Sequence, residues 1–370
     1  MDQTITTKDY LFVGLALLIA AALAAIMTPL VKKFAVKVGA VDVPKDNRRM
    51  HHKPIPRLGG LAIFIAFSVS VAVMHRVCGN VVVETPDIGI AIGSLMIILL
   101  GIFDDIYALP AIPKFLVQLL AASVAAYFGC RIIRISNPLI ASDATYLELP
   151  KWVSFIVSVI WIVAITNAVN FIDGLDGLAA GISAISAGSL MMIAILMNNI
   201  PMAVIMAALM GGCLGFLPYN FNPAKIFMGD TGSTFLGFIL ATVSIKGMFK
   251  LWAFVSFAVP ILILGVPIFD ICFAFLRRVA KGQNPMAADR GHIHHRLIDI
   301  GFSQRQAVAI AYMMTAILGL TAIVLTLDGE MQALLLIGAF IVAGAVGIII
   351  IMRNKFEDET PQEKKDDKKD

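Results

Sequence analysis

Charge is scarce in this sequence: Asp, Glu, Lys and Arg make up 15% of its 370 residues, while 59% are hydrophobic. A soluble protein of this size would need far more charge to cover its surface. The four cysteines form no CxxC pair, which argues against a zinc site or a disulfide framework. The net charge of +4 comes without a nucleic-acid-binding motif or a basic and aromatic groove, so we expect no nucleic acid partner.

Long apolar runs recur along the chain, whose mean hydropathy is +0.88. A spanning helix needs ~20 apolar residues, and open strands cannot cross hydrocarbon because their backbone groups would stay unpaired. We therefore predict an all-α polytopic integral membrane protein with about eleven transmembrane helices. The predicted spans are 10–30, 58–77, 87–103, 115–131, 152–169, 177–198, 200–217, 233–249, 251–276, 306–327 and 331–352. The third is short and the ninth long, so broken or tilted helices fit the pattern.

The distribution of Lys and Arg predicts an orientation. With the loop after the first helix placed inside, 22 of the 29 basic residues fall on the inner side. The positive-inside rule then puts the N-terminus outside and the C-terminus in the cytoplasm. We assign 1–352 to a single transmembrane domain and 353–370 to a disordered cytoplasmic tail of mixed charge. Alternation within the outer segment 131–151 favours a small external β-hairpin.

Aspartates stand in the short polar breaks between these apolar runs. A charge at membrane depth costs at least ~2.5 kcal/mol, so carboxylates at the edge of a membrane bundle suggest a function that needs them. They occupy alternate breaks, which the predicted topology places on the inner side. They are Asp104, Asp105, Asp173, Asp176 and Asp230. A cation-coupled transporter, the remote alternative, would instead place acidic residues deep in its spans and at both faces.

Several carboxylates in one place repel one another, and a divalent cation removes that conflict. Mg²⁺ prefers a few carboxylate oxygens, waters and substrate phosphates. Phosphoryl chemistry also needs positive donors around the transferring group. The inner loops supply them as Arg57, Lys114, His292, His294, His295 and Arg296. This pattern favours a metal-assisted reaction on a phosphorylated, nucleotide-bearing substrate, with a membrane lipid as the second partner.

Each motif also has a structural interpretation. Asp104 and Asp105 could simply end a helix at the interface, and Asp176 could cap the next helix. The His-x-His-His run could hold zinc, although Arg290 and Arg296 beside it disfavour a cation. Lys32 and Lys33 are interpreted as topology anchors, and the role of Asp270 stays open.

Five ordered motifs together resemble the polyprenyl-phosphate N-acetylhexosamine-1-phosphate transferase family. They read HHKPIPRLGG, FDDIY, NAVNFIDGLDGLAAG, NPAKIFMGDTGS and GHIHHRL. The resemblance covers about residues 10–327 and is nearest the branch that begins wall teichoic acid and common antigen synthesis. It implies a multi-pass enzyme of the bacterial plasma membrane with its active site facing the cytoplasm. Related enzymes are often dimers, so a homodimer is compatible with it.

The reaction implied by the resemblance is transfer of GlcNAc-1-phosphate from UDP-GlcNAc to undecaprenyl phosphate, with Mg²⁺ or alternatively Mn²⁺. The products would be undecaprenyl-diphosphate-GlcNAc and UMP. Phospho-MurNAc-pentapeptide transfer is the alternative within the family. Ala108 and Leu109 follow the aspartate pair here, and the histidines are not consecutive, which favours the amino-sugar branch.

The resemblance also implies roles for individual residues. Asp230 and Asp104 would bind the metal, and Asp104 with Asp105 would deprotonate or position the lipid phosphate. The other implied catalytic residues are Asp173, His294 and His295. The implied substrate-binding residues are Arg57, Lys114, Asn170, Asp176, Asn220, Phe227, His292 and Arg296. Phe227 would stack on uracil. Attack by the lipid phosphate could be direct or proceed through an aspartyl intermediate; direct attack is favoured, since a metal can hold both phosphates.

Overall fold

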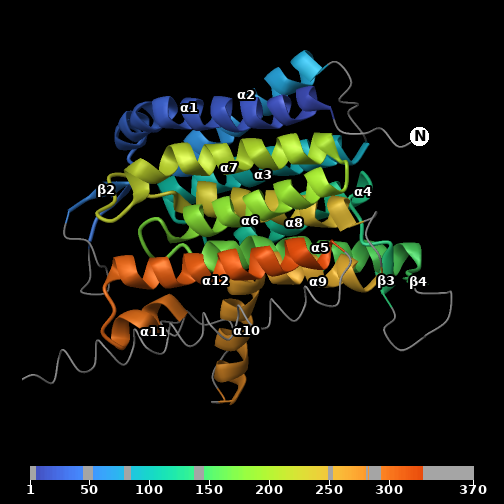
Figure 1. Cartoon of the computed structure of the whole chain (residues 1–370). Coiled ribbons are helices and arrows are strands. Elements are labelled where there is room, and N and C mark those ends of the chain that lie inside the picture. The colour runs from blue at the N-terminus through green and yellow to red at the C-terminus, as the bar shows by residue number, and fades with distance from the viewer. Residues whose placement is uncertain are drawn as a thin grey trace, which may run out of the picture.

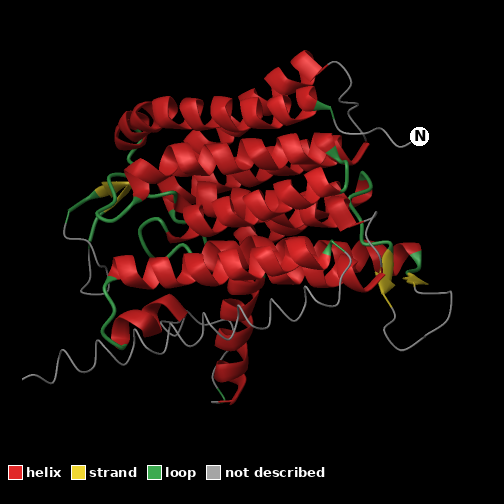
Figure 2. Ribbon diagram, in the orientation of Figure 1, coloured by secondary structure: helices red, strands yellow, loops and turns green. Residues whose placement is uncertain are grey.

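In the part of the chain that the structure describes, most helices run roughly side by side in a bundle, with two small pairs of antiparallel strands (Figures 1 and 2). The computed structural model describes residues 6–44, 53–78, 85–136, 146–248, 253–280, 282 and 293–327. The first helices are α1 (Thr7–Lys37), α2 (Gly59–Cys78), α3 (Thr85–Tyr107), α4 (Ala111–Tyr127), α5 (Lys151–Phe171) and α6 (Leu178–Leu196). The later ones are α7 (Ile200–Asn220), α8 (Gly229–Met248), α9 (Ala253–Ile263), α10 (Gly265–Ala280), α11 (Ile293–Asp299) and α12 (Gln304–Leu325).

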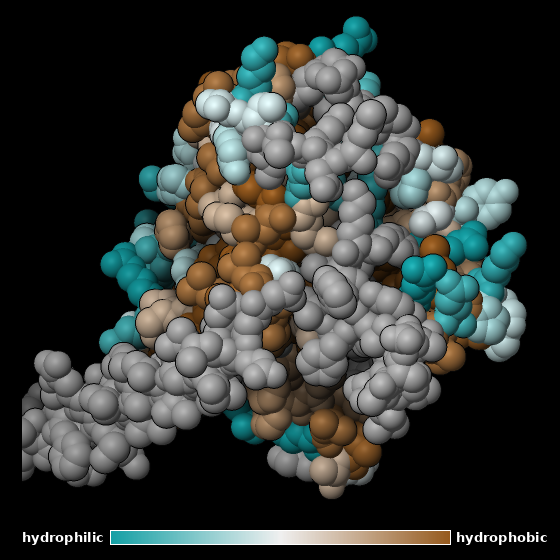
Figure 3. Space-filling view, turned by 45° about the vertical axis from the view of Figure 1, so that its right-hand side comes forward, coloured by the Kyte–Doolittle hydropathy of each residue, from teal (hydrophilic) through white to brown (hydrophobic). Residues whose placement is uncertain are grey.

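Seven of the described helices are long and apolar enough to cross a membrane. They are α1, α2, α3, α5, α6, α7 and α12, and α4 is a shorter apolar helix. The chain is therefore a mostly helical polytopic membrane protein. The predicted span 331–352 and the predicted tail 353–370 lie outside the described residues. In Figure 3, apolar side chains coloured brown lie between hydrophilic groups at the two sides of the view.

Small residues let the first helix pack closely against the bundle. Ala16, Ala20 and Ala24 of α1 are fully buried, and α1 packs on α7 and α2. On α7, a side chain at Gly211 or Gly215 would collide with the α1 backbone. Small residues four apart are the usual way in which membrane helices approach, because lipid offers no hydrophobic drive for association.

Helix α8 lies within the bundle, packed by α3, α5 and α2, and is not among the seven apolar helices. Its hydroxyl side chains are buried and bonded within the protein. Thr234 Oγ1 donates to the Asp230 carbonyl at 2.5 Å and Thr242 Oγ1 donates to the Phe238 carbonyl at 2.8 Å. A helix surrounded by protein needs no apolar lipid-facing surface, which explains why its hydropathy is modest.

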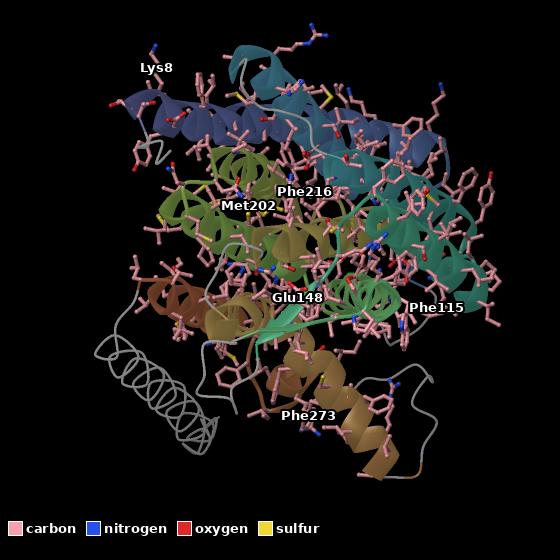
Figure 4. All side chains as sticks on the ribbon, turned by 90° about the vertical axis from the view of Figure 1, so that its right-hand side faces the viewer. Lys8, Phe115, Glu148, Met202, Phe216 and Phe273 are labelled. Atoms are coloured by element: carbon pink, nitrogen blue, oxygen red, sulfur yellow. The ribbon has the colours of Figure 1, made fainter. Side chains whose placement is uncertain are left out.

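The predicted span 251–276 is divided in the structure into α9 and α10, so it is not one continuous helix. Proline at position 267 has no N–H to donate to the Ile263 carbonyl. Ser186 Oγ from α6 donates to that carbonyl at 3.0 Å and satisfies it. Figure 1 shows α10 standing across the direction of the other helices, and Figure 4 shows Phe273 on it, outside the bundle that holds Met202 and Phe216.

The hairpin predicted over 131–151 is present. Strand β3 (Arg134–Ser136) pairs antiparallel with β4 (Tyr146–Glu148), with Ile135 opposite Leu147. A second pair, β1 (Val41–Asp42) and β2 (Ile55–Pro56), lies between α1 and α2, with Val41 opposite Pro56. In Figure 1 the two hairpins lie at opposite ends of the bundle. The site described below is at the β1–β2 end.

Candidate active site

A cavity of about 900 Å³ opens at the β1–β2 end of the bundle. Its walls come from the segments after α1, α5 and α7, with contributions from the first turns of α8 and α12. Predicted site residues lining it are Arg57, Asn170, Asp173, Asp176, Asn220, Phe227 and Asp230. Motifs that are far apart in the sequence therefore meet around one space.

Two carboxylates and one amine lie together where Asp230 lines the cavity. Lys114 Nζ, on α4, lies 2.9 Å from Asp104 Oδ2 and 3.2 Å from Asp230 Oδ2. Asp104 is at the end of α3, where its Oδ1 also accepts from the Leu109 N–H at 2.8 Å. Three helices thus bring two negative groups and one positive group together; Asp230 lines the cavity, whereas Asp104 and Lys114 are joined to it and are not among the lining residues.

Asp105 faces a different set of partners. Its Oδ1 accepts from the Asp230 N–H at 3.0 Å, and its Oδ2 accepts from the N–H and hydroxyl of Thr231 at 3.1 and 2.6 Å. These are the free donors at the N-terminus of α8, where a carboxylate is favoured. Gly229 has φ +71°, and a Cβ there would overlap the Asp105 carboxylate. The geometry assigns Asp105 to positioning Asp230.

Asp173 lies on the short segment between α5 and α6 and lines the cavity. Burial, with repulsion from Asp230 and Asp105, raises the pKa of Asp173 to about 8. At neutral pH this carboxyl therefore carries a proton for most of the time. Asn170, one turn before it, donates from Nδ2 to Ser233 Oγ of α8 at 3.0 Å.

Backbone hydrogen bonds between distant segments hold Phe227 at the cavity wall. Its N–H donates to the Pro56 carbonyl at 2.8 Å, and its carbonyl accepts from the Gly59 N–H at 2.9 Å. Asn220 is 3% exposed. It accepts from the Gly177 N–H at 3.1 Å and donates to the Ile226 carbonyl at 3.0 Å. Asn220 therefore joins the Asp173–Gly177 segment to the segment that carries Phe227.

The cavity wall near β2 is basic. Arg57 lines it and lies 3.4 Å from Asp42, through Nη2 and Oδ1. Lys32 and Lys53 line it too. Lys32, which the sequence analysis interpreted as a topology anchor, lies on α1 and also lines the cavity.

The HxHH motif is only partly described. His294 and His295 belong to α11, but their side chains and the whole of His292 lie outside the described residues. Arg296 is described: its guanidinium lies 4.7 Å from the ring centroid of Phe273 on α10. Arg296 is not among the residues that line the cavity.

Asn222 and Gln304, which the sequence analysis did not select, also line the cavity. Asn222 Nδ2 donates to Asp176 Oδ2 at 3.0 Å and to Gln304 Oε1 at 2.6 Å. The Ala224 N–H adds a 3.0 Å bond to the same Asp176 oxygen. Asn222 stands inside the NPAK motif and could have been chosen from it. Gln304 had no such signal, since it opens α12 outside every motif.

The donor set at Asp104 and Asp230 suits a magnesium ion. Among the described residues there is no group of three or more His, Cys, Asp or Glu side chains that could hold a metal. Mg²⁺, however, is commonly bound through one or two carboxylates, with waters and substrate phosphates completing its shell. Two carboxylates that already share one cation, Lys114, fit that requirement.

Comparison with known proteins gives consistent results. The sequence profile described as "Glycosyl transferase family 4" matches residues 88–248. The probable undecaprenyl-phosphate N-acetylglucosaminyl 1-phosphate transferase of Bacillus subtilis is 41% identical over 300 residues, covering 81% of each chain. The decaprenyl-phosphate N-acetylglucosaminephosphotransferase of Mycobacterium tuberculosis is 33% identical over 346 residues, covering 87% of this chain and 85% of the relative. The Escherichia coli undecaprenyl-phosphate alpha-N-acetylglucosaminyl 1-phosphate transferase is 25% identical, covering 78% and 77%.

Proposed function

Because the chain belongs to glycosyl transferase family 4 and is a phosphotransferase, we propose that it transfers GlcNAc-1-phosphate from UDP-GlcNAc to undecaprenyl phosphate. The products are undecaprenyl-diphosphate-GlcNAc and UMP. The observation that carries the proposal is the pairing of Asp104 and Asp230 on Lys114, with Asp230 lining the same cavity as Phe227 and Asp176.

The chemistry needs one bond made and one broken. An oxygen of the lipid phosphate attacks the β-phosphorus of UDP-GlcNAc, and the bond from that phosphorus to the UMP oxygen breaks. Direct attack is favoured, because a site that holds both substrates in line converts the reaction into an intramolecular one. Asp104 can accept the remaining proton of the lipid phosphate, in keeping with general base catalysis by a positioned carboxylate.

Lys114, Asp104 and Asp230 would form the phosphate end of the site. Lys114 is a positive group close to where the transferring phosphoryl group would lie, so it opposes the negative charge that develops there. Asp230 and Asp104 would hold Mg²⁺, which would supply charge neutralisation for the diphosphate. Asp105 contributes by holding the first turn of α8, and hence Asp230, in place.

The nucleoside end would lie at Phe227 and Asp176. An aromatic ring that stacks on a base contributes ~1–3 kcal/mol in other nucleotide-binding proteins. The Asp176 carboxylate can accept a hydrogen bond from the base, since an ionised carboxylate only accepts. The basic wall of Lys32, Lys53 and Arg57 gives the cavity positive charge for an anionic substrate.

We place the enzyme in a bacterial plasma membrane with the cavity facing the cytoplasm, where nucleotide sugars are made. The reaction would be the first membrane step in the synthesis of a cell-surface glycopolymer such as wall teichoic acid. The names of the relatives support the lipid acceptor and the GlcNAc group.

The test is UMP release by detergent-purified protein with undecaprenyl phosphate, comparing UDP-GlcNAc with UDP-MurNAc-pentapeptide. We expect release from UDP-GlcNAc alone, lost when the metal is chelated and restored by Mg²⁺. Release from the pentapeptide substrate alone would assign the protein to the other branch. No release from either donor would reject the proposed reaction and reopen the transporter alternative.

A further inference from the structure

The first turn of α12 reaches into the proposed nucleotide site through a chain of hydrogen bonds. Asp176 Oδ2 accepts from Asn222 Nδ2, and the same nitrogen donates to Gln304 Oε1. Arg305 Nη2 donates to the Asn222 carbonyl at 2.9 Å. Asp176, Asn222 and Gln304 all line the cavity. The start of α12 is thus bound to the segment that carries Asn222 and, through Asn222, linked to Asp176.

These contacts define which way each amide group faces. An ionised carboxylate accepts hydrogen bonds and cannot donate them, so Asn222 must turn its Nδ2 towards Asp176. The second hydrogen on Nδ2 then requires an acceptor, which places Oε1 of Gln304 towards Asn222. The Nε2 of Gln304, with two hydrogens to donate, is consequently turned away from Asn222.

One acceptor and one donor are left over at this wall. Within the described part of the chain, Asp176 Oδ1 and Gln304 Nε2 have no hydrogen-bond partner, although both side chains line the cavity. Because they are bonded to the same nitrogen of Asn222, the two side chains lie side by side. The wall therefore offers an acceptor next to a donor, in the cavity that Phe227 also lines.

An acceptor next to a donor is the complement of the imide edge of uracil. Ribose is attached at N1, so the edge remote from the diphosphate consists of N3–H, which donates, and the C4 carbonyl, which accepts. Cytosine presents an unprotonated N3 and an amino group there, with both polarities reversed. Enzymes commonly read bases through such edges together with aromatic stacking.

We propose that Gln304 is a specificity-determining residue that reads the base: its Nε2 donates to the C4 carbonyl of uracil while Asp176 Oδ1 accepts from N3–H. The inference rests on the proposed use of a uridine nucleotide and adds the residue that selects uracil over cytosine. Sites that hydrogen-bond a substrate group discriminate strongly against analogues lacking it, because their own polar groups are then left unpaired.

The test uses Gln304→Glu in the full-length, detergent-purified protein. The new carboxylate keeps an oxygen to accept from Asn222, so the link to the loop is retained, while the donor is replaced by an acceptor. Gln306→Glu is the matched control, since Gln306 is exposed two residues on and its Oε1 accepts from Ser303 in a capping box that Glu also forms. Equilibrium binding of UMP and of CMP is measured for each protein.

We expect Gln304→Glu to weaken UMP binding and to lower the ratio of UMP to CMP affinity by about tenfold, as for loss of one hydrogen bond to a buried polar partner. Gln306→Glu should change the ratio by less than about twofold. Equal weakening of UMP binding and CMP binding would mean that the added charge only repels the phosphate. An unchanged affinity for UMP would mean that Gln304 only supports Asn222. Either outcome overturns the inference.

Failure of the proposed function is recognised separately. UMP release from UDP-GlcNAc by the unmodified protein tests the reaction, whereas the binding ratio tests the base-reading residue alone. A protein that releases UMP yet keeps its UMP-to-CMP ratio in Gln304→Glu retains the proposed function and loses this inference. A protein that binds no uridine nucleotide loses both.

Discussion

At the scale of single residues, the neighbouring Asp104 and Asp105 have different partners. Asp104 shares Lys114 with Asp230, whereas the adjacent Asp105 has its two oxygens occupied by donors from Asp230 and Thr231. Consecutive helical residues point about 100° apart, so an Asp-Asp pair at a helix end addresses two different neighbours. Asp104 is thus paired with the Lys114–Asp230 group, and Asp105 holds the first turn of α8 in position.

Asp230→Asn should abolish transfer without unfolding the protein. The change removes one negative charge from the pair that faces Lys114 and keeps the side chain's size, so we expect a loss of about a hundredfold or more in the rate of UMP release. Thermal unfolding of the purified variant checks that the fold is kept. Asp299→Asn, at the exposed end of α11, is the matched control and should turn over normally. Near-normal turnover of Asp230→Asn would remove this residue from the reaction centre.

Asp173→Asn should stabilise the protein in a pH-dependent way. The folded-state pKa of Asp173 is raised from 3.8 to about 8. Its contribution to stability is therefore complete below about pH 4 and is lost as pH rises through about 8. Asparagine carries no charge to bury, so the gain in Tm should grow from pH 5 to pH 8 and level off above it. Thermal unfolding across that range in a chelator measures the gain. An equal gain in Tm at every pH would contradict a raised pKa of Asp173 in the folded protein.

At the scale of secondary-structure elements, the interruption between α9 and α10 depends on one hydroxyl from another helix. In hydrocarbon an unpaired carbonyl is costly, and a proline leaves one free. Ser186 Oγ meets the Ile263 carbonyl four residues before Pro267. The break is thus tolerated because α6 supplies a donor at that depth. It directs α10 across the bundle, where Phe273 meets Arg296 of α11.

Ser186→Ala should destabilise the protein, because it leaves the Ile263 carbonyl without its donor. A buried unsatisfied polar group costs about 1–3 kcal/mol, so Tm should fall by several degrees. Ser183→Ala is the matched control on the same helix: its hydroxyl is buried but has no hydrogen-bond partner, so its removal should leave Tm unchanged or higher. Thermal unfolding of both variants, compared with the unmodified protein, measures these changes in Tm. Equal Tm values would show that the Ser186 bond does not support the break.

At the scale of the whole molecule, the chain returns repeatedly to one end of the bundle. Helix α8 starts at the cavity with Asp230 and runs away from it, yet Gln304, which opens α12, is bonded at the same cavity. The segment between them therefore brings the chain back, although α9 and α10 are not one straight helix. This return allows motifs on alternate loops to share one site.

The predicted sidedness can be tested directly. Because 22 of 29 basic residues lie in the loops assigned to the inside, an epitope tag inserted within 137–145 should be labelled on intact spheroplasts. A tag within 353–370 should be labelled only after permeabilisation. Both variants should keep UMP release, which shows that the insertions leave the fold intact. The reverse labelling pattern would invert the proposed orientation.

The sequence alone determined the membrane class, the approximate positions of most helices and the small hairpin near residue 140. These features depend on local composition: apolar length, alternation and turn residues are visible without neighbours. The sequence also identified the aspartates of the loops, because a charged residue between apolar runs is conspicuous. The span 331–352, the membrane orientation, the magnesium ion and the roles of the site residues remain predictions.

Only the tertiary structure decided which partners those residues have and which roles they can take. The break after Ile263 depends on a serine far away in the sequence, and the use of Asp105 as a cap depends on where α8 begins. Gln304 belongs to no motif and is held at the cavity by its hydrogen bond from Asn222. A hydrogen bond is a relation between positions in space, so no local pattern in the sequence could have predicted these partners.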